Sequence, residues 1–105
     1  MLSYRLQHPR ETEHLVHKGL KRLYDDDSSK GVPAGSADKL RKMLAFLDDM
    51  GSADELRNLS VWKAHSLAGN RKGTWSLSVT GNWHLTFRVD LEEQEIRDLN
   101  LENYR

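Results

Sequence analysis

The chain of 105 residues contains no cysteine and no long apolar run. Without cysteine it has no disulfide, no thiolate zinc site and no cysteine nucleophile. No apolar stretch approaches the ~20 residues that a membrane-spanning helix requires. The first ten residues also lack the apolar segment of a secretory signal. These absences favour a cytoplasmic protein that does not contact a membrane.

Charge of one sign is missing from the middle of the chain. The totals cancel, because 16 basic residues face 16 acidic ones. Residues 57–88, however, hold five lysines and arginines and no carboxylate, together with His65 and His84. Residues 25–56 and 89–105 each carry a net charge of −4. This distribution predicts one positively charged face that binds an anion.

The first half of the chain has the hydrophobic period of helices. One helix is predicted over residues 18–24, followed by a loop of aspartate, serine, glycine and proline. The strongest signal predicts a second helix, with Ser36 as its N-cap and Gly51 just beyond its C-terminus. A serine–glutamate capping box then predicts a short third helix over residues 53–56.

After residue 57 the apolar residues alternate with polar ones, as they do in strands. Two strands are predicted over residues 74–79 and 83–89, joined by a turn. Weaker patterns predict strands over residues 61–65 and 95–101. The last of these is predicted to contain a bulge, because its alternation is imperfect.

The order of these elements predicts a single α+β domain. Helices come first and a meander of strands follows, which is typical of helices packed on one face of a small antiparallel sheet. The other face then carries polar side chains such as His84 and Arg88. Residues 1–12 are polar and without period, so they are predicted to be an N-terminal extension. The domain itself is predicted to span residues 13–105 and to begin with a short strand over residues 13–16.

Five motifs then follow one another along the chain. They are Lys18-Gly19-Leu20-Lys21-Arg22-Leu23-Tyr24, Gly31-Val32-Pro33-Ala34, Trp62-Lys63-Ala64-His65-Ser66-Leu67-Ala68-Gly69-Asn70-Arg71-Lys72-Gly73, Asn82-Trp83-His84-Leu85-Thr86-Phe87 and Asn100-Leu101-Glu102-Asn103-Tyr104-Arg105. Taken in this order they resemble the HigB-type toxins of the RelE/ParE superfamily. The resemblance covers about residues 14–105 and implies the RelE-like fold.

The resemblance also implies an activity and partners. It implies a type II toxin that enters the ribosomal A site and cleaves mRNA there without a metal or cofactor. It implies a HigA-type antitoxin whose helix-turn-helix domain binds the operon's promoter, so that this chain meets promoter DNA only indirectly. The residues themselves predict no metal site, because His14 and His17 have a suitable spacing but no third ligand nearby.

RNA cleavage of this class uses the 2′-OH as nucleophile, and it needs an acid–base group and fixed cations. His65 matches the motif histidine and is predicted as the acid–base group; the alternative is a surface or capping histidine on a loop. His84 stands where the family usually has arginine. It is predicted as a second acid–base group or phosphate donor, with a solvated strand residue as the alternative. Arg88 is predicted to hold the scissile phosphate, unless it pairs across strands with Glu95 or Asp98.

Three further basic residues are predicted to contact RNA. Arg71 and Lys72 lie in a loop bracketed by glycines, and such a loop can carry cations to a phosphate backbone. The alternative is that they are ordinary loop charges. Lys63 is a weaker candidate for the same contact.

The C-terminal residues complete the predicted site. Tyr104 matches the family's tyrosine and is predicted to stack on a base or to form a hydrogen bond near the phosphate. Its alternative is a packing aromatic at the end of a strand. Asn103 replaces the usual aspartate and is grouped with the catalytic residues. Arg105 replaces the usual final histidine and is grouped with the RNA-binding ones.

Three functions follow from these patterns. The first is a toxin that cleaves ribosome-bound mRNA. The second is a catalytically weak relative that mainly binds its antitoxin and tunes promoter repression. The third keeps the fold and changes the target, as in ParE-like inhibitors of gyrase, although the histidine-containing loop and the terminal tyrosine argue against it.

Overall fold

The computed structural model describes residues 16–52, 54–57, 59, 61–71, 73–90, 92 and 95–104. Five expectations fall outside these residues: the extension over 1–12, the strand up to residue 15, His14, Lys72 and Arg105. Within the described ranges, no helix combines the length and the apolar character that crossing a membrane would require.

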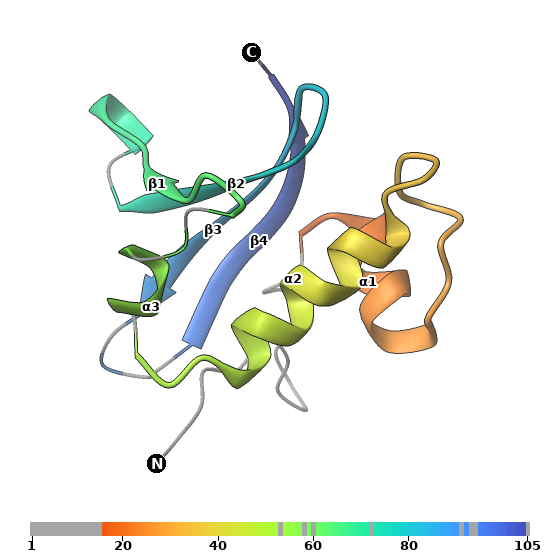
Figure 1. Cartoon of the computed structure of the whole chain (residues 1–105), viewed down its shortest axis with the longest axis horizontal. Coiled ribbons are helices and arrows are strands. Elements are labelled where there is room, and N and C mark those ends of the chain that lie inside the picture. Colours follow the sequence, from red (N-terminus) through yellow and green to blue (C-terminus); the bar gives the residue numbers. More distant parts are fainter. Residues whose placement is uncertain are drawn as a thin grey trace.

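The described residues form an α+β domain, as predicted, in which helices precede an antiparallel sheet (Figure 1). The helices are α1 (Lys18–Asp26), α2 (Ala37–Asp49) and α3 (Asp54–Arg57). The strands are β1 (His65–Ser66), β2 (Thr74–Thr80), β3 (Trp83–Asp90) and β4 (Glu95–Asn103), with a 3-10 turn at Gly69–Arg71. The strands lie side by side in chain order, and each neighbouring pair is antiparallel.

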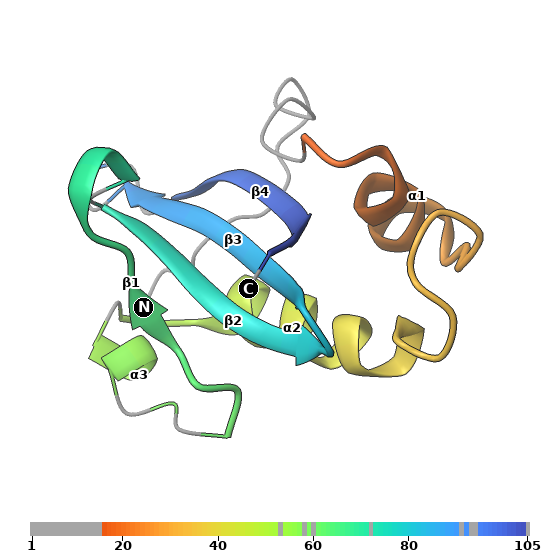
Figure 2. The same cartoon turned by 90° about the horizontal axis from the view of Figure 1, so that it is seen from above.

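The core lies between α2 and one face of the sheet. In Figure 2, α2 lies below the sheet and α1 lies beside it. Leu40, Met43 and Leu47 of α2 are fully buried in the same cluster as Leu85 and Phe87 of β3. The helical period of α2 and the alternation of β3 therefore point their apolar residues at one another.

Both ends of α2 lie where they were predicted, with Ser36 as the N-cap and Gly51 directly after the C-cap. Ser36 does occupy the N-cap position, but its side chain forms no capping bond; its hydroxyl instead donates to the carbonyl oxygen of Pro33 at 2.6 Å. At the other end the C-cap residue is Met50, which is extended with φ −60° and ψ 128°. Gly51 follows Met50 without a left-handed φ.

The capping box before α3 is confirmed. The backbone N–H of Asp54 donates to the Ser52 hydroxyl at 3.2 Å, and the N–H of Ser52 donates to Glu55 Oε2 at 3.1 Å. This reciprocal pair begins a helix of a single turn.

The start of α1 is fixed by a close approach of two glycines. A methyl group built on Gly19 would lie 1.9 Å from the carbonyl oxygen of Gly31, and one built on Gly31 would lie 2.5 Å from the Cα of Gly19. The loop before α2 therefore passes directly against the backbone of α1. His17 caps the same helix, because its Nδ1 accepts from the N–H of Leu20 at 3.2 Å, and burial lowers its pKa.

The predicted strand over residues 61–65 is wrong in most of its length. Residues 61–63 form a turn in which Lys63 has a left-handed φ of 52°, and only His65–Ser66 pairs with β2. The carbonyl of Trp62 still accepts from the N–H of Ser78 at 2.8 Å, which holds the turn against the sheet.

The predicted bulge in β4 is confirmed. Thr86 pairs with Asn100 but Arg88 pairs with Arg97, so β4 has one extra residue between these pairs. Asp98 lies in that stretch with a left-handed φ of 54°. The bulge returns Asn100 to the same sheet face as Thr86, and this places the end of β4 beside the polar residues of β3.

Candidate active site

The sheet face turned away from α2 carries polar side chains in ordered rows, and we call it the polar face. Its members are Thr74, Ser76, His84, Thr86, Arg88, Asn100 and Glu102. One row crosses the sheet through His65, Ser76, Thr86 and Asn100. The rows on either side of it contain His84 opposite Glu102, and Thr74 opposite Arg88. The sequence prediction of a polar sheet face opposite the helices is thereby confirmed.

His84 and Tyr104 form a stacked pair at one end of this face. Their ring centroids lie 4.1 Å apart with an angle of 25° between the ring planes. Ser76, which is fully buried, joins them: its hydroxyl lies 2.8 Å from the Tyr104 hydroxyl and 3.4 Å from His84 Nδ1. The backbone N–H of Tyr104 donates to the carbonyl of Asn82 at 2.9 Å. This hydrogen bond fixes the residue after β4 to the turn between β2 and β3.

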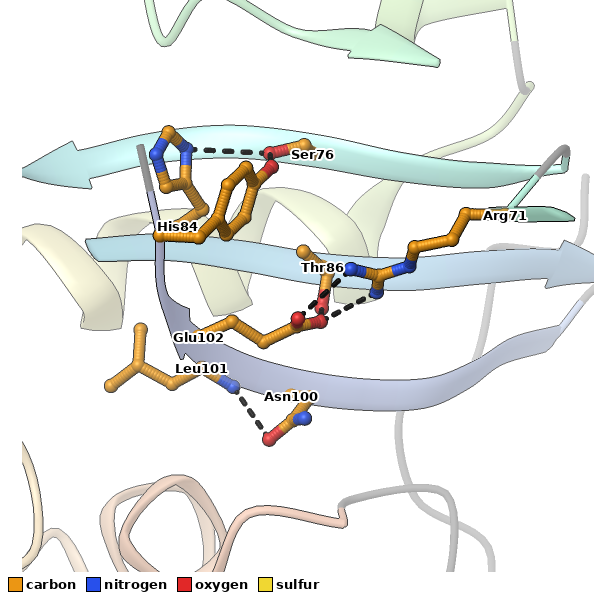
Figure 3. A network of polar contacts seen from close by, with 8 residues as sticks. Arg71, Ser76, His84, Thr86, Asn100, Leu101 and Glu102 are labelled. Atoms are coloured by element: carbon orange, nitrogen blue, oxygen red, sulfur yellow. Dashed lines mark hydrogen bonds and ion pairs between the residues drawn. The ribbon is translucent and has the colours of Figure 1, made fainter. Parts of the chain in front are cut away.

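Glu102 holds a second group of side chains next to this pair (Figure 3). Arg71 donates to both of its carboxylate oxygens, at 2.9 and 2.7 Å, and the Thr86 hydroxyl donates to Oε2. The hydrogen bond from Arg71 is the main cause of a lowered pKa of the Glu102 carboxyl, and that from Thr86 acts in the same direction. Glu102 also raises the pKa of the Arg71 guanidinium. The pair is therefore ionised and geometrically fixed.

A cleft of about 300 Å³ opens beside this group. Its lining residues are Val16, Asn70, Arg71, Thr74, Thr86, Arg88, Asp98, Asn100 and Glu102. The loop that carries Asn70 and Arg71 forms one wall, and the bulged part of β4 forms another. The cleft thus brings together the loop and the strand face that the sequence predicts to meet an anion.

His65 lies at the outer edge of the polar face. The register places it opposite Ser76, and its ring is exposed. Its Nδ1 lies 2.9 Å from the carbonyl oxygen of Lys63. Since a carbonyl can only accept, Nδ1 carries the ring proton in this contact. The neutral ring then presents Nε2 as a proton acceptor. Lys63 itself is exposed in the turn before β1.

Arg88 lies on the polar face two rows from His84. The cross-strand pairs considered for it are not formed: Glu95 binds Arg97 at 2.8 Å, and Asp98 has no ion pair with Arg88. Asn103 lies opposite Trp83 on the other side of the sheet, so its side chain is not part of this constellation. The structure therefore brings together His65, His84, Arg88, Arg71 and Tyr104 and leaves Lys63 and Asn103 apart.

Sequence reasoning did not select three residues of the polar face. Ser76 and Thr86 alternate with apolar neighbours on β2 and β3, and this pattern does place them on the same face as His84. Glu102 lies two residues before Tyr104 and so shares its face. The alternation was a usable signal, but it did not reveal that these three side chains hold the candidate catalytic ones in place.

The described ranges were predicted to contain no metal site, and their possible ligands are considered next to that prediction. No group of three or more histidine, aspartate or glutamate side chains there is arranged to hold a metal ion. His17 instead serves as the cap of α1.

Residues 13–104 match the family model described as the RelE-like toxin of the type II toxin–antitoxin system HigB. The chain belongs to this family. A curated relative from Proteus vulgaris, named Endoribonuclease HigB, is 39% identical over 88 residues, which cover 84% of this chain and 92% of that protein.

Membership of the HigB-like toxin family confirms two sequence predictions. The chain has the RelE-like α+β fold, and it is a toxin of a type II toxin–antitoxin system, which implies an antitoxin partner. The matched range includes every described residue of the polar face, as well as the two glycines that meet between α1 and the following loop.

Proposed function

We propose that this HigB-like toxin is an endoribonuclease that cuts mRNA in the ribosomal A site. The relative of the same family is named for endoribonuclease activity. The observation that carries the proposal is the His84–Tyr104 pair, which is held by Ser76 beside the Arg71–Glu102 ion pair on an open sheet face. These are groups that acid–base and electrostatic catalysis of phosphodiester cleavage require.

The reaction begins at the 2′-OH of the RNA. A base removes its proton, the 2′-oxygen bonds to phosphorus, and the bond from phosphorus to the 5′-oxygen breaks. The products are a 2′,3′-cyclic phosphate and a 5′-OH. His65 supports the first step, because its Nδ1 is engaged with the Lys63 carbonyl and its Nε2 is the ring atom left to accept a proton.

His84 and Tyr104 serve the opposite end of the reaction. In the hydrogen-bond chain that we propose, Tyr104 donates to Ser76 and Ser76 donates to His84 Nδ1, which leaves the ring proton of His84 on Nε2. That proton faces the phosphate or the leaving 5′-oxygen. His65 and His84 lie two strands apart, about 10 Å in the pairing direction, so a phosphodiester group fits between them.

Arg71 and Glu102 organise this site rather than react in it. The carboxylate receives both prongs of the guanidinium and the Thr86 hydroxyl, so its proton-accepting capacity is already used. Glu102 lies directly opposite His84 and keeps a negative charge beside that ring.

Expression of the chain alone in a bacterial cell tests the proposal. We expect growth arrest, with mRNA ends that fall inside codons and carry a 5′-OH. Harmless expression would contradict it and favour the weak, antitoxin-binding relative, and DNA-damage signalling without mRNA cleavage would favour a gyrase inhibitor. His65→Ala should relieve growth arrest without changing the melting temperature.

The antitoxin in this proposal is of the HigA type. Family membership implies an antitoxin, and the resemblance of the sequence to HigB-type toxins supports this class of partner. We propose that contact with promoter DNA passes through the antitoxin only. Co-expression with the neighbouring open reading frame should restore growth and yield a complex on size-exclusion chromatography. Continued growth arrest with that reading frame present would contradict the pairing.

A further inference from the structure

Arg88 differs from Arg71 and Arg97 because its guanidinium is not paired with a carboxylate. Arg71 is bound to Glu102, and Arg97 is bound to Asp90 and Glu95. Among the described residues, the Arg88 side chain forms neither an ion pair nor a hydrogen bond, and the residue is exposed. A guanidinium in this state presents its full set of donors to a ligand.

The position of the Arg88 guanidinium is defined by the loop after β1. A methyl group built on Gly73 would lie 3.6 Å from Nη2 of Arg88, so this end of the side chain lies against the loop. Arg88 also lines the cleft of about 300 Å³ on the polar face. One wall of the cleft therefore carries the guanidinium of Arg88, which is not paired with a carboxylate.

Asn100 adds a second donor to the same cleft. The N–H of Leu101 lies 2.9 Å from the Asn100 side-chain Oδ1 (Figure 3). Because a backbone N–H can only donate, the atom that it meets is the amide oxygen. The amide nitrogen of Asn100 is left to donate to a ligand. A cleft that offers a guanidinium and an amide N–H₂ favours a ligand rich in acceptors, such as a phosphate group.

Two carboxylates line the cleft and would oppose an anion. Glu102 does so weakly, because Arg71 and Thr86 occupy both of its oxygens. Asp98 is exposed at the bulge and forms no ion pair with another described residue. Arg88 and Asp98 therefore act in opposite directions on any anion in the cleft, and this opposition can be measured with one variant of each.

The cleft is separate from the His84–Tyr104 pair, because neither ring is among its lining residues. Arg88 lies four residues beyond His84 on β3, which corresponds to about 13 Å along the strand. The row of Thr86 lies between them on the same face. The Arg88 guanidinium lies beside Gly73, at the end of β2 where Thr74 pairs with Arg88, whereas His84 pairs with Ser78 at the other end of that strand. A role for Arg88 at another phosphate departs from the sequence prediction that it holds the scissile one.

We propose that Arg88 and the Asn100 amide form a subsite for a second, non-reacting phosphate of the same RNA strand. This inference rests on the proposed ribonuclease function. The subsite sets the register of the RNA along β3, so that the phosphate to be cut arrives between His65 and His84. Binding energy gained at the unreactive phosphate thereby positions the reactive one.

The first test is a binding measurement at several salt concentrations. The probe is a single-stranded 2′-O-methyl oligonucleotide, which lacks the attacking hydroxyl and stays intact. We expect Arg88→Ala to weaken binding about tenfold and to reduce the slope of log Kd against log salt by about 0.7. Asp98→Asn should tighten binding. Arg22→Ala, at an exposed position of α1 outside residues 57–88, is the matched control and should leave the slope unchanged.

The second test locates the phosphate. Short mRNAs that carry one neutral methylphosphonate linkage, moved along the strand, are placed on the ribosome and cleaved. At one non-scissile position the neutral linkage should raise the KM of the wild type about tenfold and should have no further effect on Arg88→Ala, since both changes remove the same contact.

The outcomes separate this inference from the function on which it rests. If the wild type cleaves mRNA but Arg88→Ala lowers kcat at unchanged KM, Arg88 acts at the scissile phosphate and the subsite is wrong. Additive effects at every methylphosphonate position would also overturn it. If the wild type cleaves no mRNA and binds no oligonucleotide, the proposed function fails and the subsite falls with it.

Discussion

Arg71 and Glu102 lie 31 positions apart in the chain and meet through two hydrogen bonds of 2.9 and 2.7 Å. The contact ties the loop after β1 to the last strand. Thr86 of β3 donates to the same carboxylate, so three segments converge on one side chain. Glu102 also lies directly opposite His84 in the sheet. The polar face is therefore held together by a contact across the sheet, and not by one strand alone.

Removing the charge of Glu102 should make the stability of the protein less sensitive to acid. The pKa of this carboxyl is lowered in the folded state from its usual value of 4.5, so its stabilising effect is present above pH 4.5 and is lost as the pH falls through the lowered value. Glu102→Gln should reduce the free energy of unfolding at pH 7 by about 0.5–1 kcal/mol. Urea unfolding at pH 7 and pH 3 measures both quantities.

The difference between wild type and Glu102→Gln should be smaller at the lower pH than at pH 7. Asp54→Asn, which removes the exposed Arg57–Asp54 pair on α3, is the control and should change stability little at either pH. An equal loss of stability in Glu102→Gln at both values would show that packing, and not charge, explains the role of Glu102.

Removing the hydroxyl of Ser76 should slow catalysis by releasing two rings at once. Ser76 is fully buried and contacts both Tyr104 and His84. Ser76→Ala should lower kcat by up to about a hundredfold, since small displacements of catalytic groups cost that much. It should also change the pH profile of the reaction, and Ser76→Thr should restore part of the rate. A rate loss in Ser76→Ala with an unchanged pH profile would refute the link to His84. Ser29→Ala, in the exposed loop before α2, is the control.

An added methyl group at Gly19 should destabilise the fold. Alanine favours helices over glycine by about 0.5–1 kcal/mol, but this methyl would lie 1.9 Å from the carbonyl oxygen of Gly31. The backbone must move, and overpacking of this kind costs about 1–3 kcal/mol. Thermal unfolding of Gly19→Ala should therefore show a lower melting temperature. In Gly35→Ala the methyl meets nothing within 4 Å, so that variant reports backbone strain alone; an equal effect in both would remove the close contact as the cause.

The sequence predicted those elements in which apolar residues recur at the regular spacing of a helix or a strand. Helix α2 and strands β2 and β3 have such periods, and their apolar faces meet in the core. The strand expected over residues 61–65 failed because its local pattern resembles a strand while Lys63 adopts a turn conformation. At the ends of α2, Ser36 and Gly51 take the predicted positions, but the Ser36 side chain forms no capping bond and its hydroxyl donates to Pro33.

The candidate site was only partly predictable. Alternation placed His84 and Arg88 on one face, and the family motif drew attention to His65 and Tyr104. Which polar side chain touches which depends on the register of β4 against β3, and a single extra residue at the Asp98 bulge sets that register. Contacts of Glu102 with distant residues could not be foreseen before that register was known.

The most direct test of the account is the rate at which purified protein cleaves mRNA in the A site of a programmed ribosome. Wild type should produce 5′-OH and 2′,3′-cyclic phosphate ends. His65→Ala and Tyr104→Phe, each with an unchanged melting temperature, should be slower by about a hundredfold or more. Full-rate cleavage by the variant that combines both substitutions would contradict the claim that the polar face is the active site.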